Sequence, residues 1–415
     1  MRDTVSTSEL APPAPAPTTP IQPAAEPPAA APKRTSLVSE ALAWLAVGHC
    51  VTDFHSSAVS TLQPVLVERY ALSLAQAGVV GGVFMFGSSV LQLPFGMLSD
   101  RVRSRMFSAL GPLAAGVFLS CLGLAVGFKS LLVLIALGGV GIAAFHPQSA
   151  TEATMRSGER RGMGMALFIT AGTFGLALGP PVFSGIIETF GFDSFPIAMA
   201  PGVLIAALLL WRLPPPIAHA KQRTGVDWVA LGAKWKPLGL HYGLVVLRST
   251  VQLSFANFLS IYLMRERGFT LSQASLTLSM FFLAASIGSF IGGHLSDRIG
   301  GKKVIVLSMI GASPFFWLFL TTTGWVSIVS LFLGGAFLLL TIPVNVVMAQ
   351  ELVPSQAGTV TSLMMGFSWG IAGIAFMPPI GSAAERFGLQ AVLSAVALLP
   401  LPGFLLSLKI PERAS

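Results

Sequence analysis

The sequence predicts an all-α polytopic membrane protein whose twelve transmembrane helices form two six-helix repeats. Of its 415 residues, 53% are hydrophobic and only 10% are charged, and the mean hydropathy is +0.76. A soluble domain of this length would carry many more polar residues on its surface. Each membrane-spanning helix needs about 20 apolar residues, so the chain has room for twelve. Motifs that recur at one fixed spacing then divide these helices into two halves.

The N-terminal segment, residues 1–36, is rich in proline and alanine and contains few large apolar side chains. Such a segment cannot bury enough apolar surface to fold, so we expect a disordered tail. It has no continuous apolar segment behind a basic start, which argues against a cleaved signal peptide. The first span would then serve as the insertion signal.

Apolar runs that end at charged residues or at Gly/Pro clusters predict the spans. In the N-terminal six-helix half, residues 37–213, they lie near 38–66, 75–98, 105–127, 130–152, 163–187 and 192–213. In the C-terminal six-helix half, residues 239–409, they lie near 240–263, 273–295, 303–322, 326–348, 359–383 and 389–408. The polar segment 214–238 is predicted as a cytoplasmic linker between the halves, and 410–415 as a cytoplasmic C-terminus.

The positive charges are distributed as in a membrane protein. The net charge is +8, but the Lys and Arg residues form no stripe with interleaved aromatic residues, so a nucleic-acid partner is not expected. Most of them lie in loops that share one side if the N-terminus is cytoplasmic, and Lys and Arg favour the cytoplasmic side. We therefore expect a multi-pass protein of the cytoplasmic (inner) membrane with both termini in the cytoplasm, since outer-membrane proteins are β-barrels.

Three pairs of motifs indicate that the two halves are copies of one unit. "LSLAQAG" at 72–78 recurs as "FTLSQAS" at 269–275, and "GMLSDR" from Gly96 recurs as "GHLSDR" from Gly293. "IIETFG" ending at Gly191 recurs as "AAERFG" ending at Gly388, and all three pairs are 197 residues apart. Duplicated halves of this kind place a binding site between them, near the middle of the bilayer.

The "LSDR" loops carry a resemblance to a known family. The loop residues are Gly96, Asp100, Arg101 and Arg105 in the first copy and Gly293, Asp297, Arg298 and Lys302 in the second. They match the signature loop between spans two and three of the major facilitator superfamily, which the chain resembles over nearly its whole length after the tail. One departure is Arg103, where the signature has a glycine that Gly300 keeps in the second copy. The resemblance implies the major facilitator fold and transport by alternating access.

Two interpretations of the loop residues remain open. An Asp at the cytoplasmic end of a span can accept hydrogen bonds from the N-terminus of a neighbouring helix, where the helix dipole favours an anion. Together with the basic residues it would form a gate that locks one conformation. Alternatively, the arginines and lysines are ordinary cytoplasmic anchors.

Glycines in the fifth span form a second motif. Gly172, Gly175, Gly179 and Pro180 resemble the family's antiporter signature, a glycine row that ends in Gly-Pro. Small residues let helices approach closely, so close packing without any meaning for export is the alternative. Gly366, Gly370 and Gly373 in the eleventh span are the expected counterparts, which suggests that the feature also serves the symmetry of the repeat.

Ionisable residues inside apolar spans are the candidate functional groups, since a charge at the bilayer centre costs about 2.5 to 3.5 kcal/mol. His49 and Asp53 are four residues apart and share a helix face, whereas His55 points elsewhere. We predict proton coupling at Asp53, His49, His146 and Glu152 and substrate binding at Arg248, Gln252, Gln148 and Asn345. Arg248 is permanently charged and suits a carboxylate or phosphonate. The alternatives are that Asp53 forms a structural ion pair and that Arg248 merely neutralises it.

"HCVTD" in span one, "FHPQS" in span four, a basic residue in span seven and "AQELVP" after span ten resemble a narrower branch, the fosmidomycin-resistance-like exporters. The matching positions are His49, Asp53, Phe145, His146, Pro147, Gln350, Glu351, Leu352 and Pro354. Members of that branch often have a Glu directly after His-Pro, where this chain has Gln148. The resemblance implies proton-coupled efflux of drugs or small anionic compounds such as phosphonates, with Gln350 and Glu351 in the gating region.

Other functions remain as alternatives. A proton-driven uptake symporter for an organic anion would use the same residues, and a membrane-embedded enzyme could use His49, Asp53 and His146. No His-Glu-x-x-His motif and no phosphate-binding loop ending in Gly-Lys-Ser/Thr occur, so we expect no metal, no cofactor and no ATP-driven step. The expected partners are a small-molecule substrate, protons and the lipid bilayer, and the protein should act as a monomer.

Overall fold

The computed structural model describes residues 39–102, 104–157, 161–216 and 226–411, and within these ranges it contains helices and no strand. The predicted tail at 1–36 lies outside the described residues. So do Arg103, residues 158–160, the middle of the predicted linker at 217–225, and residues 412–415.

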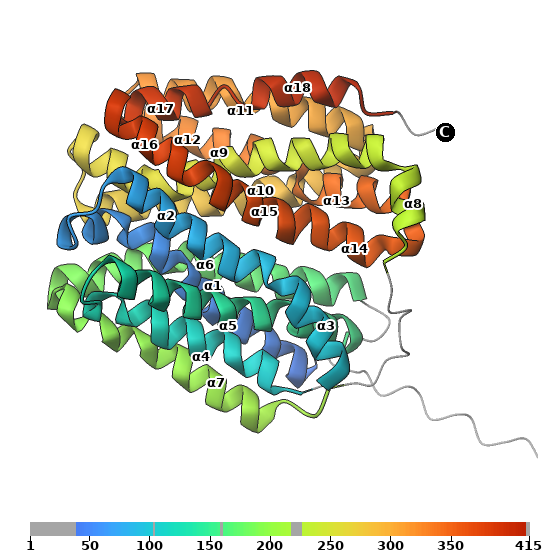
Figure 1. The fold of residues 1–415 in the computed structure, drawn as a ribbon, viewed down its shortest axis with the longest axis horizontal. Coiled ribbons are helices and arrows are strands. Elements are labelled where there is room, and N and C mark those ends of the chain that lie inside the picture. The colour runs from blue at the N-terminus through green and yellow to red at the C-terminus, as the bar shows by residue number, and fades with distance from the viewer. Residues whose placement is uncertain (1–38, 103, 158–160, 217–225, 412–415) are drawn as a thin grey trace, which may run out of the picture. The chain divides into compact units, whose positions relative to one another are not determined.

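The helices of the N-terminal half cover the six predicted spans. They are α1 (Glu40–Arg69), α2 (Leu74–Met85) with the π-helical turn η1 (Phe86–Val90), α3 (Gln92–Val102), α4 (Met106–Ser120) with the 3-10 turn η2 (Cys121–Leu124), α5 (Phe128–Met155), α6 (Arg161–Phe190), the 3-10 segment η3 (Phe192–Met199) and α7 (Ala200–Arg212). Figure 1 shows them running side by side along one direction.

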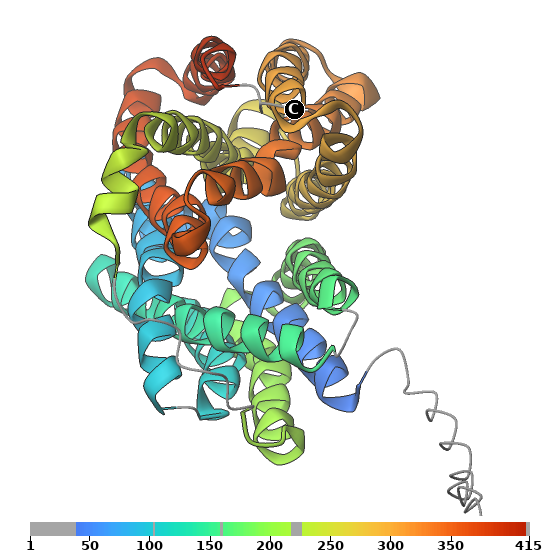
Figure 2. The same ribbon diagram turned by 90° about the vertical axis from the view of Figure 1, so that its right-hand side faces the viewer.

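The C-terminal half has more breaks within its spans. Helix α8 (Trp228–Ala233) and the start of α9 lie within the predicted linker. The helices of this half are α9 (Trp235–Arg267), α10 (Leu271–Ile299), α11 (Gly301–Thr321), α12 (Gly324–Leu339), α13 (Thr341–Leu352), η4 (Pro354–Gln356), α14 (Ala357–Thr361), the π-helical turns η5 (Ser362–Phe367) and η6 (Ala372–Phe376) on either side of α15 (Ser368–Ile371), α16 (Met377–Phe387), α17 (Leu389–Val396) and α18 (Pro400–Leu408). Figure 2 shows the N-terminal half below and the C-terminal half above, and the two halves are in contact through α2 with α16 and through α6 with α10.

Helix α1 is less apolar than a typical membrane span. Eleven helical segments among the described residues are long and apolar enough to cross a bilayer, and α1 is not one of them. Its 30 residues would still extend about 45 Å at 1.5 Å per residue. Helix α1 packs against α4, α5, α6, α7 and α9. The polar side chains that lower its hydrophobicity, such as Thr52 and His55, are therefore buried against other helices.

The repeated "SLAQ" and "TLSQ" motifs begin α2 and α10 in the same way. The Ser73 hydroxyl accepts a hydrogen bond from the Gln76 backbone N–H, and the Gln76 side chain accepts one from Ser73 N–H. Thr270 and Gln273 repeat both bonds at the start of α10. These capping boxes satisfy N–H groups that have no partner within the helix. They fix where each helix starts, at the end of the bundle away from Glu40 and Leu408, hereafter the distal end (left in Figure 1).

Each of these helix starts also binds a carboxylate from the other half. Glu385 at the end of α16 accepts a hydrogen bond from Ala75 N–H of α2 at 3.0 Å, and Glu188 at the end of α6 accepts one from Ser272 N–H of α10 at 2.9 Å. Both members of the second pair lie 197 residues from those of the first, as the repeat requires. The helix dipole favours an anion at this position. The two contacts, here called the distal caps, join the halves symmetrically.

Further hydrogen bonds between the halves lie in the distal parts of the spans or near their middle. Gln63 of α1 donates to the Asn257 side chain of α9 at 2.6 Å, and Asn257 donates to the Ala77 carbonyl of α2 at 3.2 Å. Ser279 of α10 donates to the Ala177 carbonyl of α6. Gln63 and Asn257 are both buried. They bridge the two halves and help to close the distal end.

The glycines of the eleventh span contact the opposite half, which corrects one expectation. A Cβ atom on Gly370 would lie 2.0 Å from the Val90 side chain, and one on Gly366 would lie 3.0 Å from the Ser89 carbonyl oxygen. The row at Gly172 instead packs against helix α1 of its own half. The two rows therefore serve different contacts.

In the part of the chain that the structure describes, the π-helical turns η1, η5 and η6 all lie in the two facing spans, two and eleven.

Removal of both distal caps should open the distal end. We expect the double substitution E188A/E385A to shift the protein toward conformations with separated distal ends, because each lost bond joins a carboxylate to a helix N-terminus. Spin labels at exposed Lys129 and Arg386, in a background without Cys50 and Cys121, would report this as longer distances in double electron–electron resonance. The matched control is E68A, since Glu68 is exposed at the same end. An unchanged distance distribution in the double variant would contradict the role of the caps.

Candidate functional site

Three of the predicted proton-coupling residues meet between α1 and α5. His49 Nε2 lies 3.3 Å from one carboxylate oxygen of Asp53, and His146 Nε2 lies 3.5 Å from the other. His146 directly precedes Pro147, and its side chain points toward Asp53. The side chain of Asp53 is 18% exposed and that of His146 25% exposed, so water can reach the cluster.

Backbone contacts fix the tautomer of both histidines. His49 Nδ1 lies 2.8 Å from the Phe168 carbonyl oxygen, and His146 Nδ1 lies 2.9 Å from the Ile142 carbonyl oxygen. A carbonyl oxygen can only accept, so each Nδ1 must carry a hydrogen and donate it. When neutral, each imidazole therefore presents the lone pair of Nε2 to Asp53. A favourable contact with the carboxylate then requires a proton between the two atoms.

The glycine row of α6 shapes the space around helix α1. A Cβ atom on Gly172 would lie 2.5 Å from the His49 ring, and one on Gly175 would lie 1.9 Å from the Cys50 carbonyl oxygen. Gly179 is equally close to Ser57. The ring of His49 also stacks on Phe168 of α6, with centroids 4.1 Å apart. The motif thus packs α6 onto α1 and leaves room for His49, while its meaning for antiport stays a prediction.

The same cluster has the composition of a metal site. The side-chain ligand atoms of His49, Asp53 and His146 all lie within 4.8 Å of one another. Two imidazoles and a carboxylate can hold a divalent cation, and a hydrogen bond from Nδ1 to a carbonyl is a common support for a histidine ligand. The geometry therefore admits either protons or a metal ion, although the sequence gives no metal-binding motif.

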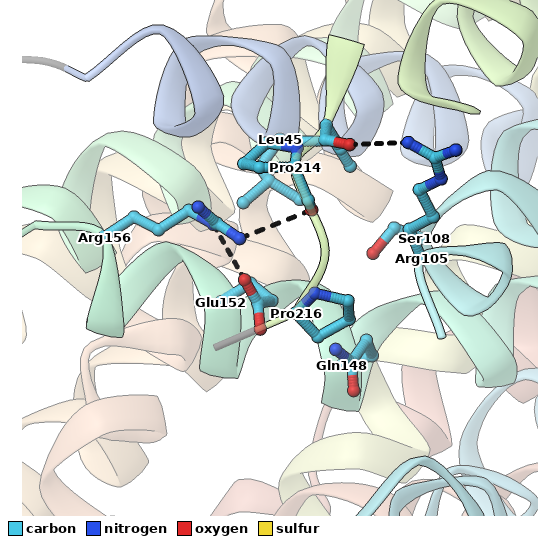
Figure 3. A pocket seen from close by; sticks show the side chains of 9 residues that line it. Leu45, Arg105, Ser108, Gln148, Glu152, Arg156, Pro214 and Pro216 are labelled. Atoms are coloured by element: carbon cyan, nitrogen blue, oxygen red, sulfur yellow. Dashed lines mark hydrogen bonds and ion pairs between the residues drawn. The ribbon is translucent and has the colours of Figure 1, made fainter. Parts of the chain in front are cut away.

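Glu152 and Gln148 line a small cavity at the end of the N-terminal half that is opposite to the distal end (Figure 3). The cavity has a volume of about 10 Å³, close to the space of one water molecule. Glu152 forms an ion pair with Arg156 at 2.7 Å, and Arg156 donates to the Pro215 carbonyl at 2.8 Å. Arg105 donates to the Leu213 carbonyl at 3.0 Å. Glu152 and Gln148 thus lie where the predicted linker begins, and their roles in proton coupling and substrate binding stay predictions.

Arg248 lies in the C-terminal half and is only 2% exposed. Its Nη1 donates to Gln252 and its Nη2 to the Ser249 hydroxyl, both at 2.9 Å. Its guanidinium carbon lies 5.4 Å from the ring centre of Trp369. The ion pairs between described residues do not include Arg248. The hypothesis that Arg248 neutralises Asp53 therefore finds no contact, because Asp53 pairs with His49 and His146 instead.

The other predicted residues are distributed over several places. The Asn345 side-chain oxygen lies 3.0 Å from His241 Nδ1, and Gln350 donates to the Thr361 hydroxyl at 2.6 Å. Asp297, Arg298 and Glu351 are exposed, Lys302 is partly buried, and Gly96 and Gly293 contact Pro147 and Pro343. Arg101 is exposed, whereas only the backbone of Asp100 is described. The cytoplasmic gate therefore stays a prediction.

Sequence reasoning missed two aromatic residues that contact the candidate groups. Phe168 holds His49 through its carbonyl and its ring, and Trp369 faces Arg248. The repeat contained a signal for the second, because Trp369 lies 197 residues after Gly172, the position that contacts His49. Phe168 precedes Gly172 by one helical turn, and no repeat motif singled it out.

The sequence profile of the Major Facilitator Superfamily matches residues 45–259 and again residues 242–415, that is, both six-helix repeats. The chain belongs to this superfamily. The resemblance inferred from the two "LSDR" loops is thus confirmed, together with the all-helical fold. Transporters of the superfamily act on small molecules, and the chain is a multi-pass membrane protein.

Curated relatives and solved structures cover most of the chain. A fosmidomycin resistance protein of Escherichia coli (strain K12) is 28% identical over 89% of this chain and 92% of its own. A D-galactonate transporter of Escherichia coli O6:H1 is 23% identical over 91% and 96%. The nucleoside transporter NupG has a TM-score of 0.72 at 16% identity over 89% and 100%, and a bacterial homologue of the lysosomal transporter Spinster has 0.71 at 16% over 88% and 95%. These structures support the fold alone.

A methyl group at Gly172 should disturb the cluster. We expect G172A to push the His49 ring out of its position and to destabilise the protein by about 1–3 kcal/mol, as overpacking does. Thermal unfolding in detergent would show a lower melting temperature. The control on the same helix is G185A, because a Cβ atom on Gly185 meets nothing within 4 Å. Equal melting temperatures for the two variants would contradict the steric role of Gly172.

Proposed function

We propose that this protein is a proton-coupled secondary transporter of the inner membrane that exports small anionic compounds by alternating access. The halves at 37–213 and 239–409 would rock against each other as one functional monomer, joined by the linker at 214–238. The termini would lie in the cytoplasm, so the distal end would face outward. The observation that carries this proposal is the arrangement of His49, Asp53 and His146.

The cluster can couple protons to helix movement because its contacts depend on bound protons. Both histidines donate Nδ1–H to backbone carbonyls. When neither Nε2 nor Asp53 carries a proton, the lone pair of each Nε2 therefore faces a carboxylate oxygen of Asp53 and repels it. Protons shared at these positions turn the repulsion into charge-assisted hydrogen bonds. His49 and Asp53 lie on α1, whereas His146 lies on α5. Loss of a proton would therefore favour separation of the two helices at this point.

The C-terminal half supplies the reason for an anionic substrate. Arg248 is a permanent cation buried without a carboxylate partner among the described residues. A buried charge without a counter-charge is costly, and a bound carboxylate or phosphonate would supply that counter-charge. The fosmidomycin resistance protein among the relatives favours export of a phosphonate-like compound, so we propose drug/proton antiport and antibiotic resistance as its context.

Uptake of an organic anion with protons is the second candidate. It would use the same two sites, and the D-galactonate transporter among the relatives favours it. The direction of substrate movement under an imposed pH gradient distinguishes the two. Substrate movement opposite to the proton flux would indicate antiport and therefore export. Movement of substrate and protons in the same direction would indicate symport and therefore uptake.

Replacement of Asp53 should uncouple protons from substrate. In proteoliposomes with a pH-sensitive dye inside, we expect fosmidomycin to cause proton movement with wild-type protein and none with D53N, because the amide cannot hold the shared protons. D193N is the control, since Asp193 is exposed at the distal end and pairs with Arg69. If D53N behaves like wild type, Asp53 is a structural partner of the two histidines and the proposed coupling is wrong.

Metal content tests the enzyme alternative. We expect purified protein to contain far less than one divalent ion per chain by inductively coupled plasma mass spectrometry. H294Q provides the matched control, because His294 is exposed. One zinc or similar ion per chain that is lost in H146Q but kept in H294Q would favour a metal-dependent function over proton coupling.

A further inference from the structure

Arg248 has hydrogen-bonding capacity that the protein does not use. Gln252 and Ser249 accept from its two terminal nitrogens, but its Nε is fully buried and has no partner among the described residues. A buried N–H without an acceptor destabilises a protein, and more so when the group is charged. Gln252 and Ser249 also hold the guanidinium in place. The free N–H therefore has a fixed position.

Trp369, a neighbour of Arg248, has a second unused donor. Its ring lies under the Arg248 guanidinium at 5.4 Å, and its indole Nε1 is likewise buried without a partner. Indole can only donate through this nitrogen. Two donors with no acceptor, one of them on a permanent cation, thus belong to side chains that touch. An anionic group could accept hydrogen bonds from both donors.

The repeat places this pair close to the position of the proton cluster in the other half, because Arg248 lies 197 residues after Val51, between His49 and Asp53. In the N-terminal half, α1 and α6 meet where Gly172 faces His49. In the C-terminal half, α9 carries Arg248, and Trp369 lies 197 residues after Gly172. The same pair of helices thus occurs in both halves. In the N-terminal copy it holds a titratable group beside a glycine, and in the C-terminal copy it holds a permanent cation beside an indole.

We propose that Trp369 is the second half of an oxyanion-binding site, in which Arg248 Nε–H and Trp369 Nε1–H donate to the oxygens of one carboxylate or phosphonate group. This proposal rests on the proposed function and names the residue that sets its substrate class. The π-face of the indole stabilises the guanidinium while no anion is present, by cation–π interaction. A neutral compound offers no charge to replace that interaction and is not bound.

The position of Trp369 also connects the bound anion to the opposite half. Trp369 lies in α15, which has only four residues and is flanked by the π-helical turns η5 and η6. Such turns interrupt the regular hydrogen-bond ladder of a helix and often mark functional sites. The glycines beside it, Gly366 and Gly370, contact Ser89 and Val90 of span two. A shift of Trp369 on anion binding therefore acts on the segment that touches the N-terminal half.

Binding measurements on purified full-length protein test this site. The probes are fosmidomycin as a phosphonate and D-galactonate as a carboxylate, titrated by isothermal calorimetry. We expect W369F, which keeps an aromatic ring but loses the N–H, to weaken binding of the better probe about tenfold. R248Q should remove binding, and W325F, at an exposed tryptophan, should bind like wild type. W369H, which restores a ring N–H, should recover most of the affinity even if W369F folds poorly.

The outcomes separate this inference from the proposed function. Wild-type affinity in W369F together with no binding in R248Q would overturn the role of Trp369 and leave the anionic substrate in place. Wild-type affinity in both W369F and R248Q would overturn both, and so would a wild-type protein that binds neither probe. A loss of affinity in W325F equal to that in W369F would show that the effect is not local and would also overturn the inference.

Discussion

A polar side chain inside the hydrocarbon layer must find its partner within the protein, and the structure of helix α1 follows from this requirement. Thr52 donates to the Gly48 carbonyl, His55 contacts the carbonyls of Val51 and Ala198, and Asp53 lies between two histidines. These contacts require neighbours on several sides of α1. The glycines of α6 satisfy the requirement, because only a helix without side chains on one face can approach α1 so closely. The polarity of α1 and the small residues of α6 are thus parts of one arrangement.

Duplication gave the two halves one scaffold, and their polar residues have since taken different roles. The position equivalent to Asp53 is Thr250, whose hydroxyl only donates to the Val246 carbonyl of its own helix. The C-terminal half has Arg248 instead, a group that stays charged at any physiological pH. At this place one half therefore has imidazole and carboxylate side chains, and the other has a permanent charge. In the proposed transporter, protons and the anion occupy separate halves, so they can influence each other only through the movement of helices.

The sequence predicted those features that depend on spacing along the chain. Apolar length gave the twelve helices, and the constant offset of 197 residues gave the repeat, because both survive any arrangement of helices in space. The shared face of His49 and Asp53 was predictable for the same reason. Which helices face one another was not. One alternative placed Arg248 beside Asp53, yet its neighbour is Trp369. The second glycine row was expected to repeat the first, yet it contacts the opposite half. Periodicity orients a residue on its own helix but does not say which helix lies opposite.

Two arginines of the N-terminal half bind the start of the linker and thereby limit how far the halves can move apart. Arg105 and Arg156 bind the carbonyls of Leu213 and Pro215, so the chain stays attached to the N-terminal half as far as this point. It is described again from Val226, two residues before helix α8, which leads into α9 of the other half. Ten peptide units join Pro216 to Val226, and such a length reaches at most about 35 Å when fully extended. The covalent chain thus acts as a tether, and while both arginines hold it, its length sets an upper bound on the opening of this side.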